Sequence, residues 1–249
     1  MGRPGIDLTD FDTITRRFSE DRPSAVLHCA AMSRSPACQA DPPRAWLQNV
    51  EVTRHLVSIC NGVPFTFLST DLVFRGDQGG LDETARPDPV SVYGKTKMEA
   101  EEVVRSLGQH LIVRTSLNYG HSPSADRAFN EEMVQAWNSG RTLRLFTDEY
   151  RTPIAASETA RAVLDLMANG ASGTLHVAGR ERLSRWELGR LIAGLYPGLD
   201  TGIEATSFRN YQGPPRAADV TLDCQKAERL LGRAMPRFSE WLRDFGPGD

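Results

Sequence analysis

Residues 64–71 read Pro-Phe-Thr-Phe-Leu-Ser-Thr-Asp, and residues 93–97 read Tyr-Gly-Lys-Thr-Lys. The first stretch is an apolar run that ends in two hydroxyl residues, which predicts a buried strand. In an open α/β sheet, ligand-binding residues lie at the carboxyl ends of such strands. The second stretch lies in an amphipathic pattern over 92–104 that follows the turn-like Arg-Pro-Asp-Pro at 86–89, so it predicts a helix.

Tyr93 and Lys97 are four residues apart, and this spacing places both side chains on one helix face. A free tyrosine has a pKa of about 10 and is a poor acid at neutral pH. A nearby ammonium favours its phenolate, and a hydroxyl such as that of Thr70 can hydrogen-bond the same substrate oxygen. This combination suits the delivery of a proton to a ketone oxygen while hydride arrives at the carbon. Chance spacing on an exposed helical turn is the competing interpretation.

The composition is that of an ordinary globular protein, with 249 residues, 40% apolar residues, 24% charged residues and a net charge of −3. The length suits one large domain, or a domain with a small lobe. The sequence has no basic tract, which gives little support for nucleic-acid binding. No apolar run approaches the roughly 20 residues of a membrane-spanning helix, and residues 1–4 do not begin a signal peptide. We therefore expect a cytoplasmic protein that binds neither nucleic acid nor membrane.

The cysteines and histidines give no sign of a metal site. The four cysteines form no Cys-x-x-Cys pair, and we expect Cys29 and Cys60, which lie in apolar segments, to be buried free thiols. The five histidines are scattered without metal-ligand spacing, so we predict no metal.

Strand and helix patterns alternate along the chain, which predicts a Rossmann-like, doubly wound parallel sheet with helices on both faces. Strands are expected at residues 25–31, 64–69, 111–115, 143–146 and 175–177, and helices at 12–20, 44–60, 92–104, 129–137, 157–167, 185–195, 226–231 and 238–245. Beyond Gly173 the pattern changes to a smaller, mostly helical region. We therefore expect a nucleotide-binding domain over residues 1–170 and a substrate lobe over 171–249, with segments that can interleave.

The order of motifs resembles the extended branch of the short-chain dehydrogenase/reductase superfamily. Within it, the chain is most similar to the sugar-nucleotide reductases of the dTDP-4-dehydrorhamnose reductase type. Seven segments carry the resemblance, in order along nearly the whole chain: Asp7-Leu8-Thr9-Asp10, His28-Cys29-Ala30-Ala31-Met32-Ser33, Ser69-Thr70-Asp71-Leu72-Val73-Phe74, Tyr93 with Lys97, Arg114-Thr115-Ser116 with Tyr119-Gly120, Asp148-Glu149-Tyr150-Arg151-Thr152-Pro153, and Val220-Thr221-Leu222-Asp223.

The resemblance implies a role for several of these residues. Thr70, Tyr93 and Lys97 would be catalytic. The residues implied to bind the cofactor, NADPH or NADH, are Asp7, Leu8, Ala30, Ala31, Ser33, Ser69, Tyr93 and Lys97. The residues implied to bind a nucleotide-sugar substrate are Thr70, Asp71, Arg114, Ser116 and Leu117. Two other interpretations stay open: Asp7 can cap a helix or shape a turn, and the alanines can be small core residues. A homodimer is left open.

The chain departs from the family pattern at its start and at two substrate positions. The family begins with a strand, a Gly-x-x-Gly-x-x-Gly turn, a helix and a second strand, whereas here Asp7 already resembles the acidic turn that follows them. Such a turn binds pyrophosphate through close backbone approach and a helix N-terminus. We therefore expect a truncated form that lacks roughly 30 residues, about one strand–helix–strand unit; a natural short form is the alternative. Leu72 and Leu117 replace a tyrosine and a tryptophan of the family.

Three functional hypotheses follow. The first is NAD(P)H-dependent reduction of a nucleotide-linked 4-keto sugar. The second is a sugar-nucleotide epimerase or dehydratase, although Asp71-Leu72 gives only half of the acidic pair that dehydratases carry beside the catalytic threonine. The third is a non-catalytic binding or regulatory subunit, which the absent phosphate loop favours and the intact Thr70, Tyr93 and Lys97 disfavour.

Overall fold

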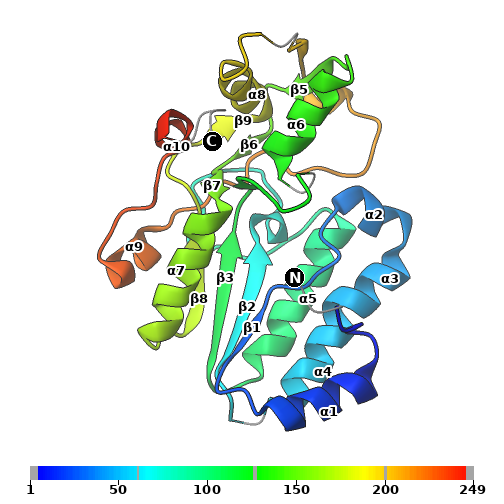
Figure 1. The fold of residues 1–249 in the computed structure, drawn as a ribbon, viewed down its shortest axis with the longest axis vertical. Helices are drawn as coiled ribbons and strands as arrows, with labels where there is room; N and C mark the ends of the chain where they lie inside the picture. The colour runs from blue at the N-terminus through cyan, green and yellow to red at the C-terminus, as the bar shows by residue number, and fades with distance from the viewer. Residues whose placement is uncertain (1–4, 61, 126–127, 199–200, 245–249) are drawn as a thin grey trace.

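The computed structural model describes residues 5–60, 62–125, 128–198 and 201–244, so residues 1–4 and the last residue predicted for the C-terminal helix, Phe245, lie outside the described part. Its centre is a parallel sheet of four strands in the order β1 (Val26–His28), β2 (Phe65–Thr70), β3 (His110–Thr115) and β8 (Gly173–Val177). The strands all point toward the upper part of the molecule in Figure 1. β1 is an edge strand of the described sheet, and Leu27 on it is 38% exposed.

Helices cover both faces of this sheet, as the alternation predicts. Successive side chains of a strand point to opposite faces, and β3 shows this directly. Ile112 packs with the cluster that includes residues of α5 (Val92–Arg105), while Leu111 and Val113 pack with the cluster that includes residues of α7 (Ala156–Ala168). The prediction of a Rossmann-like α/β fold is therefore confirmed.

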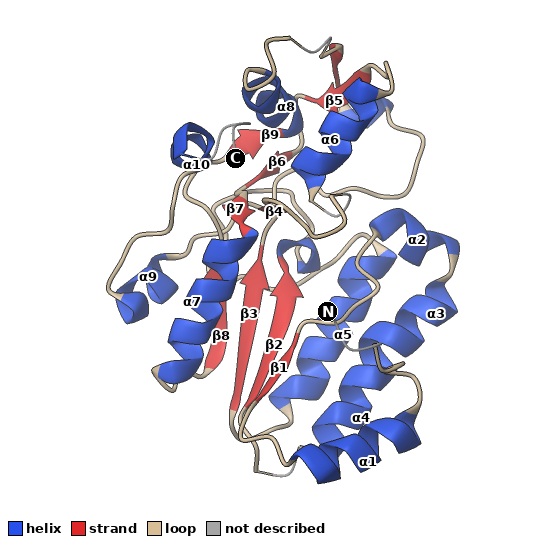
Figure 2. Cartoon of the chain, in the orientation of Figure 1, coloured by secondary structure: helices blue, strands red, loops and turns tan. Residues whose placement is uncertain are grey.

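The remaining helices near the sheet form outer layers (Figure 2). On the α5 side lie α1 (Phe11–Asp21), α2 (Ser35–Ala40), α3 (Pro42–Trp46), the π-helix η1 (Leu47–Glu51) and α4 (Val52–Ile59). On the other side, α9 (Gln225–Leu231) contacts α7 and β8. Among the residues that the structure describes, no helix combines the length and the apolar character that crossing a membrane requires.

The upper part of the molecule has its own aromatic core, which includes Tyr119, Phe129, Trp137 and Phe238. Its elements are β4 (Asn118–Tyr119), α6 (Phe129–Asn138), β5 (Leu143–Phe146), β6 (Tyr150–Arg151), β7 (Ile154–Ala155), β9 (Leu183–Ser184), α8 (Arg185–Ala193), β10 (Ile203–Thr206), η3 (Phe208–Asn210) and α10 (Phe238–Asp244). β5, which the alternation counts as one more strand of the sheet, instead pairs with β10 in a separate two-stranded sheet. Segments before and after residue 170 contribute to this core, and the division at that residue stays a prediction.

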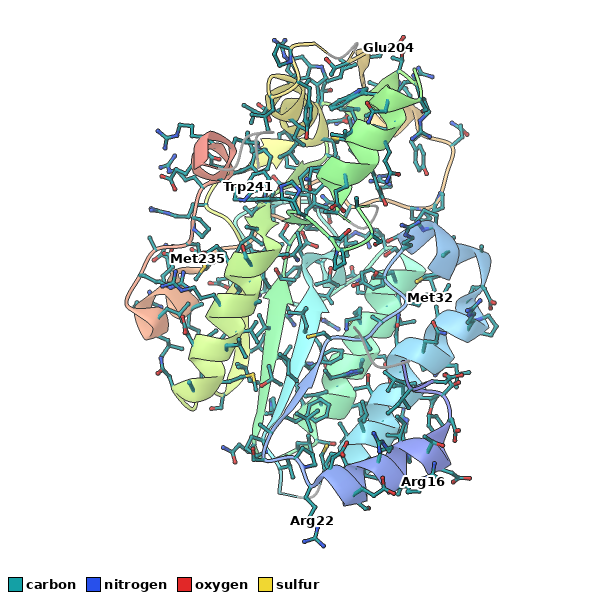
Figure 3. The ribbon with its side chains drawn as sticks, in the orientation of Figure 1. Arg16, Arg22, Met32, Glu204, Met235 and Trp241 are labelled. Atoms are coloured by element: carbon teal, nitrogen blue, oxygen red, sulfur yellow. The ribbon has the colours of Figure 1, made fainter. Side chains whose placement is uncertain are left out.

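The helix predicted over 44–60 contains a π-turn that has a structural role. This turn carries Asn49, which is 1% exposed. Its Oδ1 accepts from the Met32 backbone N–H at 2.7 Å, and its Nδ2 donates to the Met32 carbonyl at 3.1 Å and to Thr96 Oγ1 at 2.9 Å. Met32, labelled in Figure 3, lies in the loop between β1 and α2, and Thr96 lies on α5 between Tyr93 and Lys97. Asn49 thus ties this loop to α5, in keeping with the frequent use of π-turns near functional sites.

Replacement of Asn49 by alanine should lower the free energy of unfolding by about 2 kcal/mol, because it removes the three hydrogen bonds of this buried amide to Met32 and Thr96 and leaves the Met32 N–H without its side-chain acceptor. Urea unfolding measures the change. Asn169→Ala, at the exposed end of α7, is the control and should stay within about 0.5 kcal/mol of the parent. Equal effects of the two substitutions would contradict the role of Asn49.

Candidate active site

A cavity of about 1260 Å³ opens where the sheet strands end and the upper part begins. Several of the predicted site residues line it: Ala31, Ser33, Thr70, Asp71, Tyr93, Ser116 and Leu117. They come from the loop after β1, from the end of β2, from the start of α5 and from the segment after β3. Residues up to 86 positions apart are therefore brought to one surface by the parallel order of the strands.

Thr70, Asp71 and Tyr93 form the polar floor of this cavity. Thr70 Oγ1 donates to Asp71 Oδ1 at 3.1 Å and accepts the Leu72 N–H at 3.2 Å, which starts the short 3-10 helix η2 (Asp71–Val73). Ser116 Oγ donates to Asp71 Oδ2 at 2.6 Å. Burial and the charge of Asp71 raise the pKa of Tyr93, although its hydrogen bond with the Thr70 side chain lowers this pKa in part. Tyr93 therefore keeps its proton at neutral pH and can donate it.

Gly94 allows α5 to approach the end of β2 this closely. A Cβ built at Gly94 would lie 2.1 Å from the Leu72 carbonyl oxygen and 2.8 Å from Pro89 Cβ. No side chain fits such a space, because the clash is with backbone. Ser91, the N-cap of α5, accepts the Gly94 N–H at 3.1 Å and so fixes the first turn in this place. The position of Tyr93 next to Thr70 follows from these two residues.

Lys97 lies one turn further along α5 and points toward the sheet. It is 2% exposed, its Nζ donates to the Leu68 carbonyl at 2.7 Å, and it lies 3.7 Å from the centre of the Phe67 ring. Within the described residues, no hydrogen bond or ion pair joins it to Tyr93. Burial lowers the pKa of Lys97 to about 7, although the charge of Glu101 opposes this change. In this structure the ammonium is held behind the cavity wall, rather than against the phenol as the sequence interpretation assumes.

Two predicted residues, Ser69 and Arg114, belong to a buried ion-pair network instead of the cavity wall. They are paired in register on β2 and β3, so both face Glu101 of α5. Arg114 donates to Glu101 through Nε at 3.0 Å and through Nη2 at 2.7 Å, and Ser69 Oγ donates to Glu101 Oε1 at 2.6 Å. Arg114 is 2% exposed and is not among the residues that line the cavity. The structure thus places Arg114 in the core, and the substrate contact that the resemblance implies stays a prediction.

The predicted residues nearest the N-terminus also lie outside the cavity wall. Asp7 is exposed and accepts the N–H and the hydroxyl of Thr9 at 2.9 and 2.8 Å, so it shapes a turn before α1, as the alternative interpretation has it. Leu8 is half-buried and Ala30 is exposed. Cys29, expected to be buried, is exposed because β1 is an edge strand of the described sheet. Cys60 is buried, as expected.

The residues present fit the reactive end of a nicotinamide cofactor. A phenol that holds its proton and the small residues Ala31 and Ser33 line the cavity near the ends of β1 and β2, and the buried ammonium of Lys97 lies behind its wall. The sequence has no Gly-x-x-Gly-x-x-Gly turn, and the start of α1 is capped by the carboxylate of Asp10, which accepts the Thr13 N–H at 3.1 Å. A carboxylate there disfavours a phosphate. Among the described residues, no group of three or more acidic, cysteine or histidine side chains could hold a metal ion.

Three arginines of the cavity wall were not identified from the sequence as site residues. Arg151, Arg185 and Arg216 line the cavity, and Glu149 lies behind them with no exposed surface. Arg151 and Glu149 belong to a segment that the resemblance includes, but neither was assigned a role. Arg185 and Arg216 lie in separate segments with no motif of their own, so only the fold brings them together.

The comparisons with known proteins agree with this geometry. Residues 1–246 match the family model of the RmlD substrate binding domain. The chain is 30% identical over 244 residues, 95% of its length and 81% of the relative's, to a probable low-salt glycan biosynthesis reductase of Haloferax volcanii. It is 28% identical over 258 residues, 98% of this chain and 86% of the relative, to a dTDP-4-dehydrorhamnose reductase of Sinorhizobium fredii. A crystal structure of dTDP-4-dehydrorhamnose reductase from Bacillus anthracis, in complex with NADP, is similar with a TM-score of 0.87 and 25% identity, covering 96% of this chain and 86% of that one.

Replacement of Gly94 by alanine should destabilise the protein by about 1–3 kcal/mol, because the added methyl group overpacks against the Leu72 carbonyl. Thermal and urea unfolding measure this. Gly108→Ala is the matched control, since a Cβ at Gly108 would meet no heavy atom within 4 Å. A Gly94 variant as stable as the Gly108 variant would show that the close approach of α5 is not required.

The buried ammonium of Lys97 predicts a pH dependence of stability. Between its folded pKa of about 7 and its ordinary value of 10.5, the unfolded chain binds a proton at Lys97 that the folded chain does not. The free energy of unfolding of the parent, relative to Lys97→Met, should therefore rise with pH above about 7, by at most about 1.4 kcal/mol per pH unit. Urea unfolding of both proteins at pH 6, 7, 8 and 9 tests this. A difference that stays constant across the series would contradict a lowered pKa.

Proposed function

The chain belongs to the RmlD substrate binding domain family, and we propose that it is an oxidoreductase that uses NADPH or NADH to reduce the keto group of a nucleotide-linked 4-keto sugar. The observation that carries this proposal is the convergence of Thr70, Asp71 and Tyr93 on one cavity that is large enough for a nucleotide sugar. The relatives named above are reductases, and one solved structure contains NADP. The names of two of these proteins indicate dTDP-4-dehydrorhamnose as the first substrate to test.

When bound, a reduced nicotinamide supplies the hydride. Tyr93 supplies the proton to the substrate oxygen, and its raised pKa is no obstacle, because an alkoxide is more basic than a phenolate. Thr70, which shares a hydrogen bond with Tyr93, aligns the same oxygen. Lys97 would hold the ribose of the cofactor, and its positive charge next to the site would ease loss of the Tyr93 proton. Ala31 and Ser33 would contact the cofactor, and Ser116 and Leu117 the substrate.

The two alternatives are less well supported. A non-catalytic subunit has no chemical need for Thr70, Tyr93 and Lys97 together, and the relatives described above carry the names of reductases. For an epimerase or dehydratase, Asp71-Leu72 supplies only one of the two acidic residues. We place the protein in the cytoplasm, which the four unpaired cysteines of the structure support, and we leave a homodimer open.

The proposal is tested by incubating the 249-residue chain with NADPH, or NADH, and dTDP-4-dehydrorhamnose and following nicotinamide absorbance. Tyr93→Phe should lower turnover by at least about 10²-fold, the lower end for loss of a general acid. Tyr196→Phe, which is outside the cavity wall, is the control and should keep parent turnover.

Cofactor affinity, followed by nicotinamide fluorescence, should change far less than turnover in Tyr93→Phe, because the substitution removes one hydroxyl and keeps the ring. Full activity of Tyr93→Phe would exclude Tyr93 as the acid. Binding of NADPH without any reduction of the sugar would instead favour the non-catalytic alternative.

A further inference from the structure

Three arginine side chains converge on a single buried carboxylate at one wall of the cavity. Glu149 has no exposed surface and accepts from Arg185 Nε at 2.9 Å and from Arg216 Nη2 at 2.9 Å, and Arg216 Nε donates to its other oxygen. Arg151 Nη2 lies 3.3 Å from Glu149 Oε1. The three guanidiniums reach Glu149 from β6, from the first turn of α8 and from the loop after η3. One carboxylate thus holds three cations from three separate segments.

The wall formed by Arg151, Arg185 and Arg216 carries more positive than negative charge. Burial would raise the pKa of Glu149, but the charges of Arg151, Arg185 and Arg216 and the hydrogen bonds from Arg216 hold it well below its usual range, so Glu149 is ionised at neutral pH. Asp71 is the second carboxylate near the group, and its Oδ2 lies 3.9 Å from Arg151 Nε. Arg151 therefore lies between the two carboxylates, whereas Arg185 and Arg216 are paired with Glu149 alone. Three positive charges thus face two carboxylates. The wall stays positive in a chain whose net charge is −3.

The two outer arginines have donors left over. A guanidinium has five N–H groups. Within the described residues, the side-chain hydrogen bond of Arg185 uses Nε only, so both of its terminal nitrogens are without an acceptor, and its side chain is 20% exposed and lines the cavity. Arg216 lines the cavity as well, with a 27% exposed side chain next to the ring of Phe146. Its Nε and Nη2 donate to Glu149 and its side chain also hydrogen-bonds Tyr211, so fewer of its N–H groups are left for a ligand than in Arg185. Planar donors fixed in this way suit a phosphate oxygen, which arginine can bind through two parallel hydrogen bonds.

We propose that Arg185 and Arg216 form the subsite for the diphosphate of the substrate, and that Glu149 is the residue that positions them. The proposal rests on the proposed function, which supplies a substrate with a diphosphate. Glu149 does not line the cavity, so it acts through the arginines and does not touch the ligand. Arg151 links this subsite to the polar floor of the cavity, because it contacts both Glu149 and Asp71. Asp71 in turn accepts a hydrogen bond from Thr70. The phosphate end and the keto end of the substrate would thus be held by one connected set of side chains.

The direct test is calorimetric titration of the parent, Arg185→Ala and Arg182→Ala with dTDP and, separately, with inorganic pyrophosphate. Arg182 is the matched control: its side chain is 50% exposed, it pairs with Asp219, and it does not line the cavity. Loss of charged hydrogen bonds should weaken binding of both probes to Arg185→Ala by about tenfold to a hundredfold, with Arg182→Ala equal to the parent. The affinity of the parent should fall with added salt, and the salt dependence should be smaller in Arg185→Ala. Equal affinities of the two variants would overturn the subsite.

NADPH also contains a diphosphate, so each protein is titrated with NADPH as well. Unchanged NADPH affinity in Arg185→Ala supports a substrate subsite. A loss of NADPH affinity as large as that for dTDP would overturn the assignment to the substrate.

The positioning role of Glu149 is tested with Glu149→Gln and Glu149→Asp. The glutamine variant should raise KM for the sugar nucleotide by about tenfold or more while kcat stays within a few-fold, and the aspartate variant, which keeps the charge, should recover part of the affinity. An effect confined to kcat would overturn this role. If Glu149→Gln does not fold, Arg216→Lys replaces it: the charge remains but the planar donor pair is lost, and the same rise in KM is expected, whereas an unchanged KM contradicts the proposal.

These measurements separate the subsite from the function. Weaker dTDP binding by Arg185→Ala in a protein that reduces no keto sugar would retain the anion site and reject the reductase. Reduction of dTDP-4-dehydrorhamnose with the same KM by the parent and by Arg185→Ala would retain the reductase and reject the subsite.

Discussion

The arrangement of the site depends on the contact between the first turn of α5 and the end of β2. Gly94 lets this turn lie against the Leu72 carbonyl, and Ser91 caps it there. Tyr93 then comes next to Thr70, and Lys97 comes next to the sheet at the Leu68 carbonyl. A helix displaced by the width of one methyl group would separate Tyr93 from Thr70, the two residues that we propose act on the substrate oxygen. The geometry of the proposed site is therefore a result of backbone packing.

Two buried carboxylates organise the charges around this contact. Glu101 holds Arg114 on the side of the sheet that α5 covers, and Glu149 holds Arg151, Arg185 and Arg216 at the cavity. The two groups differ in the N–H groups that their arginines have left to bind a ligand. Arg114 gives two nitrogens to Glu101 and lies against Phe74, with 2% of its surface exposed, whereas Arg185 keeps two terminal nitrogens at the cavity. The first group belongs to the core, and only the second is in a position to meet a ligand.

Local patterns in the sequence predict the helices and strands well, but they do not predict which side chains of different elements contact one another. The strand predicted at 64–69 and the helix predicted at 92–104 are close to β2 (Phe65–Thr70) and α5 (Val92–Arg105), and Thr70 and Tyr93 on these elements meet at the cavity. Strand alternation, however, turns Arg114 away from the cavity, since it is the register partner of Ser69 and both face Glu101. Arg185 and Arg216 were out of reach for a different reason. They are 31 residues apart in segments without a motif, and only the tertiary fold brings them to Glu149.

Within the part of the chain that the structure describes, the short strand β1 lies at an edge of the sheet, and this has a consequence for handling the protein. Its outer N–H and C=O groups face away from β2, and Leu27 on it is 38% exposed. An edge of this kind is a template on which another strand can pair. The loop that follows β1 carries Ala31 and Ser33 into the cavity wall, so a strand added at this edge would order that loop at the same time as it covered apolar surface. Strand pairing at Val26–His28 would therefore change both the exposed apolar surface and the cavity wall at Ala31 and Ser33.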